Sequence, residues 1–115
     1  MVERFIFWLK AINFFEPMPD EIKCLLFVVI KNGKYAYLEL RGFEKIPGEN
    51  DSYYRPQEAE FFYSKELTNI DERLLIHRVK YLISEAFSDE VIKQIYRKEK
   101  VYLKYDNIIE YLFYN

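Results

Sequence analysis

Residues 24–41 read CLLFVVIKNGKYAYLELR, which is two strand-like stretches with Asn32 and Gly33 between them. Residues 24–30 form an unbroken apolar run, and residues 35–41 alternate between apolar and polar side chains. Asn-Gly between two such runs is a strong signal for a β-hairpin, because both residues tolerate the positive φ angles of a type I′ turn. We therefore predict an antiparallel hairpin in which Asn32 and Gly33 are the two turn residues.

A two-residue turn at this position determines which side chains face one another across the hairpin. One surface then carries four facing pairs: Ile30 with Tyr35, Val28 with Tyr37, Leu26 with Glu39, and Cys24 with Arg41. The other surface carries apolar side chains only: Leu25, Phe27, Val29, Ala36, Leu38 and Leu40. We expect the all-apolar surface to meet the main core. We expect the first surface to be partly covered by the N-terminal helix, the end of the chain or a second protomer.

The N-terminal residues carry an apolar stripe at helical spacing: Phe5, Trp8, Leu9, Ile12 and Phe15. A membrane-spanning helix needs ~20 apolar residues, and Lys10 interrupts this stretch. A signal peptide begins with positive charge, whereas Glu3 is acidic. We therefore predict a core helix that ends at Pro17 and Pro19, and we expect neither a signal peptide nor contact with a membrane.

Further strand and helix patterns follow the hairpin. Residues 44–57 are polar and show neither the apolar spacing of a helix nor that of a strand, which predicts a long loop. Residues 58–64 predict a third strand. A helix is predicted after a cap at Asn69, with one apolar stripe: Leu75, Val79, Leu82, Ile83 and Ala86. A shorter helix is predicted from a cap within Ser88-Asp89-Glu90 to about Lys98.

The end of the chain predicts two more strands. Residues 101–105 alternate in polarity, Asp106 and Asn107 can form a turn, and residues 108–114 predict the return strand. A short terminal helix is nearly as compatible with these last residues. In total the patterns predict a single α+β domain over residues 1–115, in the order α-β-β-β-α-α-β-β. We expect an antiparallel sheet of about four or five strands with the helices mainly on one face.

Composition narrows the classes of function. The chain has 17 Lys+Arg against 19 Asp+Glu and a net charge of −2. It therefore lacks the overall basic character that neutralises phosphates, and we expect no nucleic-acid partner. The same order of elements occurs in double-stranded RNA-binding domains, but Asp71 and Glu72 at the start of the relevant helix would repel phosphate. The single cysteine, Cys24, cannot form an internal disulfide, so we expect a reducing, cytoplasmic location.

Nucleophilic catalysis lacks a matching set of residues. The single histidine, His77, lies opposite the apolar stripe of its predicted helix and points to water. Cys24 lies on a different element, and although facing Arg41 would favour its thiolate, a free cysteine more commonly serves as a small buried apolar residue. One Cys and one His make no zinc site, and the three glycines form no phosphate loop. We expect no cofactor, and the residues argue against an enzyme.

Carboxylates offer one alternative. Glu58 and Glu60 share a face of the predicted third strand, and Glu39 can lie on the neighbouring strand. If the three converged, they could hold Mg²⁺ or Mn²⁺ in a metal-dependent hydrolase or nuclease. Charged residues are also ordinary on the solvated face of an antiparallel sheet, so the metal site stays an alternative.

The polar loop carries Tyr53, Tyr54 and Arg55, residue types that dominate the energetics of protein interfaces. We predict that these three residues, with Glu39 and Arg41 of the hairpin, bind a protein partner through the loop of residues 47–56, as inhibitor or immunity proteins do. Alternatively, one or both tyrosines fold back to cap the edge of the sheet. A homodimer assembled through the abundant aromatic residues is a further hypothesis, since the chain has 11 Tyr, 10 Phe and one Trp.

Overall fold

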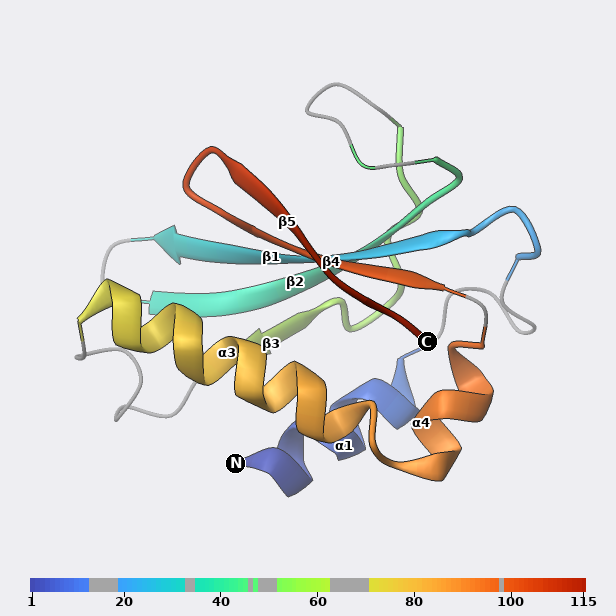
Figure 1. Ribbon diagram of the computed structural model, residues 1–115, viewed down its shortest axis with the longest axis horizontal. Coiled ribbons are helices and arrows are strands. Elements are labelled where there is room, and N and C mark those ends of the chain that lie inside the picture. Colours follow the sequence, from blue (N-terminus) through green and yellow to red (C-terminus); the bar gives the residue numbers. More distant parts are fainter. Residues whose placement is uncertain (13–18, 33–34, 46, 48–51, 63–70, 98) are drawn as a thin grey trace.

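Figure 1 shows the computed structural model, which describes residues 1–12, 19–32, 35–45, 47, 52–62, 71–97 and 99–115. The elements in chain order are α1 (Val2–Ala11), β1 (Cys24–Asn32), β2 (Tyr35–Phe43), β3 (Glu60–Phe62), α3 (Glu72–Ala86), α4 (Glu90–Ile95), β4 (Lys100–Tyr105) and β5 (Ile108–Tyr114). The predicted α+β class and the predicted order of elements are confirmed. The last element is a strand rather than a helix.

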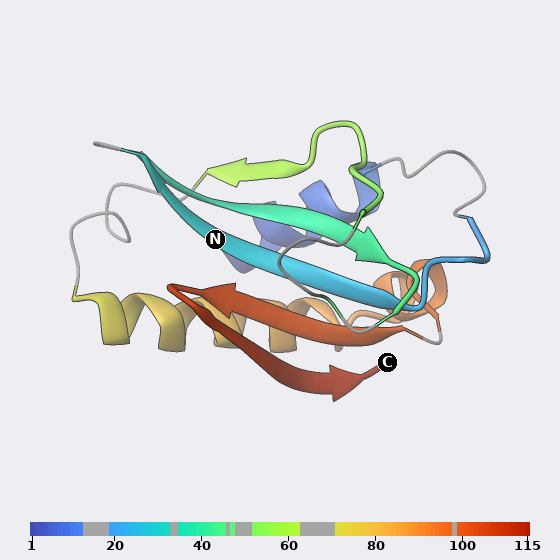
Figure 2. The ribbon, with the colours of Figure 1, turned by 90° about the horizontal axis from the view of Figure 1, so that it is seen from above.

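The five strands form a mixed sheet in the order β3-β2-β1-β4-β5, as Figure 2 shows from above. β1 pairs antiparallel with β2 but parallel with β4. The prediction of a purely antiparallel sheet was therefore wrong. It assumed that the late strands extend the sheet by hairpins, whereas α3 and α4 lead the chain back to a position beside β1. The unbroken apolar run in β1 is typical of a strand that is covered on both faces, as central parallel strands are.

The hairpin register differs from the predicted one by two residues. Asn32 pairs with Tyr35 inside the strands, so Asn32 is not a turn residue, and residues 33–34 lie outside the described part of the chain. The pairs that replace the predicted ones are Cys24 with Phe43, Leu26 with Arg41, Val28 with Glu39 and Ile30 with Tyr37. Because side chains alternate with a period of two, a shift of two residues leaves each of them on its predicted face.

One face of the sheet is covered by α1, α3 and α4, which all lie below the strands in Figure 1. The side chains buried there include those predicted for the main core: Leu25, Phe27, Ala36, Leu38 and Leu40. The N-terminal helix also packs on this side, where the Phe5 ring meets the Phe61 ring edge-on with centroids 5.0 Å apart. Because α1 lies against the main core, it does not cover the opposite face of the sheet.

Local capping explains where the later helices begin. The carboxylate of Asp71 accepts a 2.8 Å hydrogen bond from the backbone N–H of Arg73, so Asp71 is the N-cap of α3. The predicted cap, Asn69, lies outside the described residues. Within the predicted capping stretch of residues 88–90, Asp89 is the N-cap of α4, since it accepts hydrogen bonds from the backbone of Val91 and Ile92. The predicted apolar stripe of α3 is buried in the main core: Leu75, Val79, Leu82, Ile83 and Ala86.

α1 is shorter than the apolar stripe that predicted it. It has ten residues and ends at Ala11, while Phe15 and Pro17 lie outside the described residues. Phe5 and Leu9 are buried, whereas Phe7 is 73% exposed, so the helix buries one stripe only. Among the helices that the structure describes, none is both long enough and apolar enough to cross a membrane.

Candidate functional site

The face of the sheet opposite the helices, here called the open face, is turned toward the viewer in Figure 2 and carries no helix of the described chain. The centre of this face is nevertheless shielded from solvent, because five side chains form a second buried cluster: Cys24, Leu26, Val28, Phe43 and Tyr102. Large side chains of the same face shield this cluster. The Tyr53 ring lies 5.6 Å from the Phe43 ring, and the Tyr111 ring lies 5.4 Å from the Tyr102 ring.

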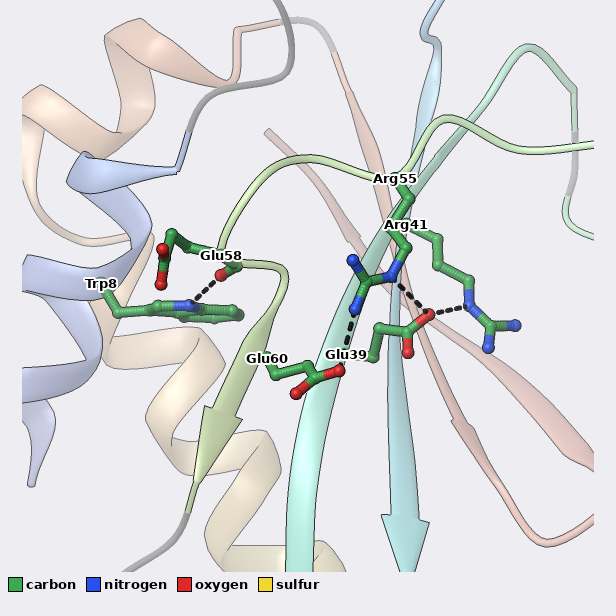
Figure 3. A network of polar contacts seen from close by, with 6 residues as sticks. All are labelled: Trp8, Glu39, Arg41, Arg55, Glu58 and Glu60. Carbon is green, nitrogen blue, oxygen red and sulfur yellow. Dashed lines mark hydrogen bonds and ion pairs between the residues drawn. The ribbon is translucent and has the colours of Figure 1, made fainter.

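Four charged side chains form a network beside this cluster (Figure 3). Glu39 of β2 and Glu60 of β3 are direct cross-strand partners, a placement that would be repulsive on its own. Arg55 lies between them, with Nη2 2.8 Å from Oε1 of Glu60 and Nε 3.9 Å from Oε1 of Glu39. Arg41 donates from Nε to the same Glu39 oxygen at 2.7 Å. The two arginines thus compensate the two carboxylates.

Arg41 is held from two directions. Its guanidinium carbon lies 4.5 Å above the centroid of the Tyr53 ring, a cation–π contact, while its Nε is bound to Glu39. The side chain of Arg41 is 22% exposed. A guanidinium restrained by both a ring and a carboxylate has lost most of its rotational freedom before any ligand arrives.

A pocket of about 390 Å³ opens beside this stack. Its lining joins aromatic rings to hydrogen-bonding groups: Phe43, Glu44, Lys45, Ser52, Tyr53 and Tyr54. Volumes of roughly 300–1,000 Å³ are typical of sites that take small molecules or anchoring side chains. The pocket therefore has the size and the mixed lining of a binding site.

Tyr54 and Tyr53 lie on opposite sides of one backbone segment. The backbone of Tyr54 exchanges two hydrogen bonds, of 2.8 and 2.9 Å, with Gly42 at the end of β2. Its side chain packs against the main core, and its hydroxyl donates to Glu44 at 3.2 Å. Burial is the main cause that raises the pKa of the Tyr54 hydroxyl, and the hydrogen bond to the Glu44 carboxylate raises it further. The tyrosines therefore fold back onto the sheet, as in the predicted alternative to partner binding, while Tyr53 stays 42% exposed.

The structure brings four of the five predicted binding residues into one cluster on the open face: Glu39, Arg41, Tyr53 and Arg55. Tyr54 joins them only as part of the pocket wall. The predicted loop of residues 47–56 also included residues 48–51, which lie outside the described residues. Sequence reasoning missed Glu60 as a partner of Arg55 and Phe43 as a support for Tyr53, because both roles depend on the register between strands.

The predicted metal trio is not assembled. Glu58 precedes β3 with a φ of 58°, and its side chain lies beside Trp8, away from Glu39 and Glu60 (Figure 3). The Trp8 indole N–H donates to the backbone oxygen of Glu58 at 2.7 Å, which holds this turn against α1. Within the described ranges, no three His, Cys, Asp or Glu residues are grouped so that they could hold a metal ion. The pattern failed here because the ladder of β3 begins two residues later than predicted.

The thiol and the imidazole also lie apart. Cys24 is 3% exposed on the open face and pairs with Phe43 rather than with Arg41. Burial raises the pKa of the Cys24 thiol, Lys100 opposes this and Glu99 adds to it, so the thiol stays protonated at neutral pH. His77 is exposed on α3, which covers the other face of the sheet. The two groups therefore have the sheet between them.

Glu99 is a buried carboxylate that no sequence motif indicated. It lies just before β4, is 3% exposed, and its Oε2 has no hydrogen-bond partner within the described chain. Burial raises the pKa of Glu99 to about 7, although Lys23 lowers it in part. Glu99 lies outside the open-face network, so we connect it with stability rather than with binding.

Comparison with protein-family models, with curated proteins and with solved structures finds no match to this chain. The open face, with its restrained arginine and its pocket, is therefore the feature on which a function can be based.

Proposed function

We propose that this chain is a small protein-binding domain, without catalytic activity, that binds its partner through the open face around Arg41 and Tyr53. One observation carries the proposal: the Arg41 guanidinium is already oriented by Glu39 and Tyr53 beside an open pocket. Tyr and Arg are enriched among the residues that dominate interface energies. Groups that are ordered before binding lose less conformational entropy when the partner arrives.

Exposed aromatic area on the same face supports the proposal. Tyr53, Phe62 and Tyr111 are 42%, 46% and 53% exposed, although each lies next to another ring. Rings that pack on one side and remain open on the other give rigid contact area at low entropic cost. The pocket beside Tyr53 can accept an anchoring side chain from the partner. We also propose a cytoplasmic location, which suits the unpaired and buried Cys24.

The test is affinity capture from native lysate with the full chain as bait. Wild type and Tyr81→Ala should recover the same partner, because Tyr81 is 55% exposed on α3, away from the open face. Tyr53→Ala and Arg55→Ala should each lose it, with unchanged far-UV circular dichroism as the check on folding. Equal recovery by all four proteins would remove the open face as the binding surface.

A homodimer is a second candidate function, and the exposed edge of the sheet favours it. β5 is an edge strand of seven residues without Pro, and its one charged side chain, Glu110, is paired with Lys80 of α3 rather than left to protect the edge. Ile108, Tyr111 and Tyr114 on this strand are 50%, 53% and 60% exposed. Sedimentation velocity at micromolar concentration should then show a dimer that Tyr111→Lys dissociates and Tyr81→Lys does not. A monomer at all concentrations would exclude this candidate.

A further inference from the structure

The net charge of the open face differs in sign from the net charge of the whole chain. Four basic side chains belong to it, two from the network and two from β4: Arg41, Arg55, Lys100 and Lys104. The acidic members of its network, Glu39 and Glu60, are both bound to arginine, and the pocket wall adds Glu44 and Lys45, whose charges cancel. The described structure contains no ion pair for Lys100 or Lys104. In a chain of net charge −2, the described residues of this face therefore carry an excess of positive charge.

Among the described residues, Arg41 has hydrogen-bond donors that no acceptor meets. Its Nε is bound to Glu39, and its two terminal nitrogens point away from that carboxylate (Figure 3). No hydrogen bond from these nitrogens occurs within the described residues. Two parallel N–H groups at the end of a restrained guanidinium match the two oxygens of a carboxylate. The orientation of Arg41 therefore leaves the free side of the guanidinium available for an acidic group.

We propose that the partner is an acidic segment of a protein, and that one of its side-chain carboxylates makes a two-point contact with the terminal nitrogens of Arg41. A neighbouring apolar side chain of the segment enters the pocket beside Tyr53. Lys100 and Lys104 attract the remaining acidic residues over a longer range. This inference deepens the proposed function and rests on it, since it assigns the chemistry of the partner.

A nucleic acid could also offer anionic oxygens to Arg41, and the aromatic rings could stack on its bases. The network disfavours it, because successive phosphates along a strand each need a basic partner, whereas both arginines of the network are already bound to carboxylates. A protein segment can place one carboxylate at Arg41 and apolar residues elsewhere. The acidic protein segment is therefore the better match.

The probe is a displayed library of random 12-residue peptides, linked at the C-terminus so that only side chains supply carboxylates. It is selected against the full chain and against two variants. Arg41→Gln removes the proposed contact, and Arg78→Gln makes the same change at an exposed position of α3. Peptides selected by wild type and by Arg78→Gln should be enriched in Asp and Glu. Those selected by Arg41→Gln should lose this enrichment.

The best acidic peptide is then synthesised with both ends blocked, and its affinity is measured by titration calorimetry. Replacing its critical acidic residue by Gln should weaken binding at least about 10-fold, because charge-assisted hydrogen bonds are among the stronger polar contacts. This change on the peptide does not depend on the folding of any variant. Arg41→Lys keeps the charge but not the two-point geometry, so it should bind nearly as weakly as Arg41→Gln.

The outcomes separate this inference from the proposed function. Selected peptides that lose affinity on Tyr53→Ala, but carry no excess of acidic residues, would overturn the inference and leave the proposed function standing. Full affinity of Arg41→Lys would overturn the two-point contact. In a competition experiment, a 20-nucleotide single-stranded RNA and the unlabelled acidic peptide are each used to displace labelled acidic peptide. If the RNA displaces it at the lower concentration, the choice of a protein partner is overturned. A selection that enriches no peptide would count against both.

Discussion

Glu39 shows how one buried charge determines the layout of the open face. It is 7% exposed on the central part of the sheet, and it is bound by Arg41 at 2.7 Å and approached by Arg55 at 3.9 Å. A charge removed from water needs such partners, and losing one of them leaves the carboxylate poorly compensated. The arginines that we assign to binding therefore also stabilise the sheet.

Arg41→Met should lower the free energy of unfolding by about 3 kcal/mol, because it leaves the buried Glu39 with only the more distant Arg55. The double variant Glu39→Gln/Arg41→Met should recover most of that loss, since it removes both charges together. Urea denaturation followed by circular dichroism measures both changes. Lys93→Met, which breaks the exposed pair with Glu90, should change stability by less than about 0.5 kcal/mol. A loss in the double variant as large as in Arg41→Met would contradict this account.

Glu99 should make stability depend on pH. Its pKa is about 7 in the folded protein against an ordinary value of 4.5, so the folded state holds a proton that the unfolded chain has released between these values. The free energy of unfolding should therefore fall as pH rises from about 4.5 to 7, by about 3 kcal/mol from this group, and then level off. Glu99→Gln should remove that slope and be more stable than wild type at pH 8. Parallel slopes in the two proteins between pH 5 and 7 would rule out Glu99 as the cause.

At the scale of elements, capping and strand pairing follow different rules. The Asp89 cap acts over three residues of chain, so it can be predicted from local sequence. β1 pairs with β2 through a local hairpin, but its other partner, β4, lies far along the chain and reaches β1 only through the packing of the helices between them. Single helices and their caps can therefore be predicted from the sequence more reliably than the order of strands in the sheet.

Asp89→Ala should lower the free energy of unfolding by about 1 kcal/mol, because two backbone N–H groups of α4 lose their acceptor. Asp89→Asn keeps a side-chain oxygen at the same place and should retain most of the stability. The hydrogen bond from Ile92, above all, lowers the pKa of the Asp89 carboxyl, so this stabilisation should be lost only as pH falls below the ordinary value of 3.8. Thermal denaturation at pH 7 and pH 3 measures both effects, and equal losses for Ala and Asn would contradict capping.

At the scale of the whole molecule, α1, α3 and α4 pack against one face of the sheet, and no helix of the described residues covers the other face (Figure 1). The main core includes residues from α1, α3, α4 and the strands, whereas the second cluster is formed by side chains of the sheet itself. α1 is joined to this core through the rings of Phe5, Trp8 and Phe61. We therefore expect α1 to unfold together with the sheet.

The single tryptophan makes this expectation measurable. Trp8 lies 5.3 Å from the Phe61 ring and bonds the backbone of Glu58, so its fluorescence reports contact between α1 and the sheet. Urea transitions followed by tryptophan fluorescence and by far-UV circular dichroism should coincide, as in a two-state domain. Leu9→Ala should shift both midpoints together and cost about 3 kcal/mol, since Leu9 is fully buried. An earlier transition in fluorescence would show that α1 is an independent unit.

Much of the architecture could be predicted because it depends on short-range patterns. The order of elements and the face to which each strand residue of the hairpin points agree with the structure. Even the error in register left the faces intact, since the shift was by an even number of residues. Periodicity decides which side of an element is apolar, and it needs no knowledge of distant residues.

The amino-acid sequence by itself determined the elements and their buried sides, because helical and strand periodicity act over a few neighbouring residues. Only the tertiary structure decided that β4 runs parallel to β1, that Glu58 turns toward Trp8, and that the Glu99 side chain is buried. Each of these depends on which segments, far apart in the chain, come to lie side by side. The burial of a side chain and the pairing of a strand depend on all the residues that surround them in space, so a local sequence pattern cannot predict them.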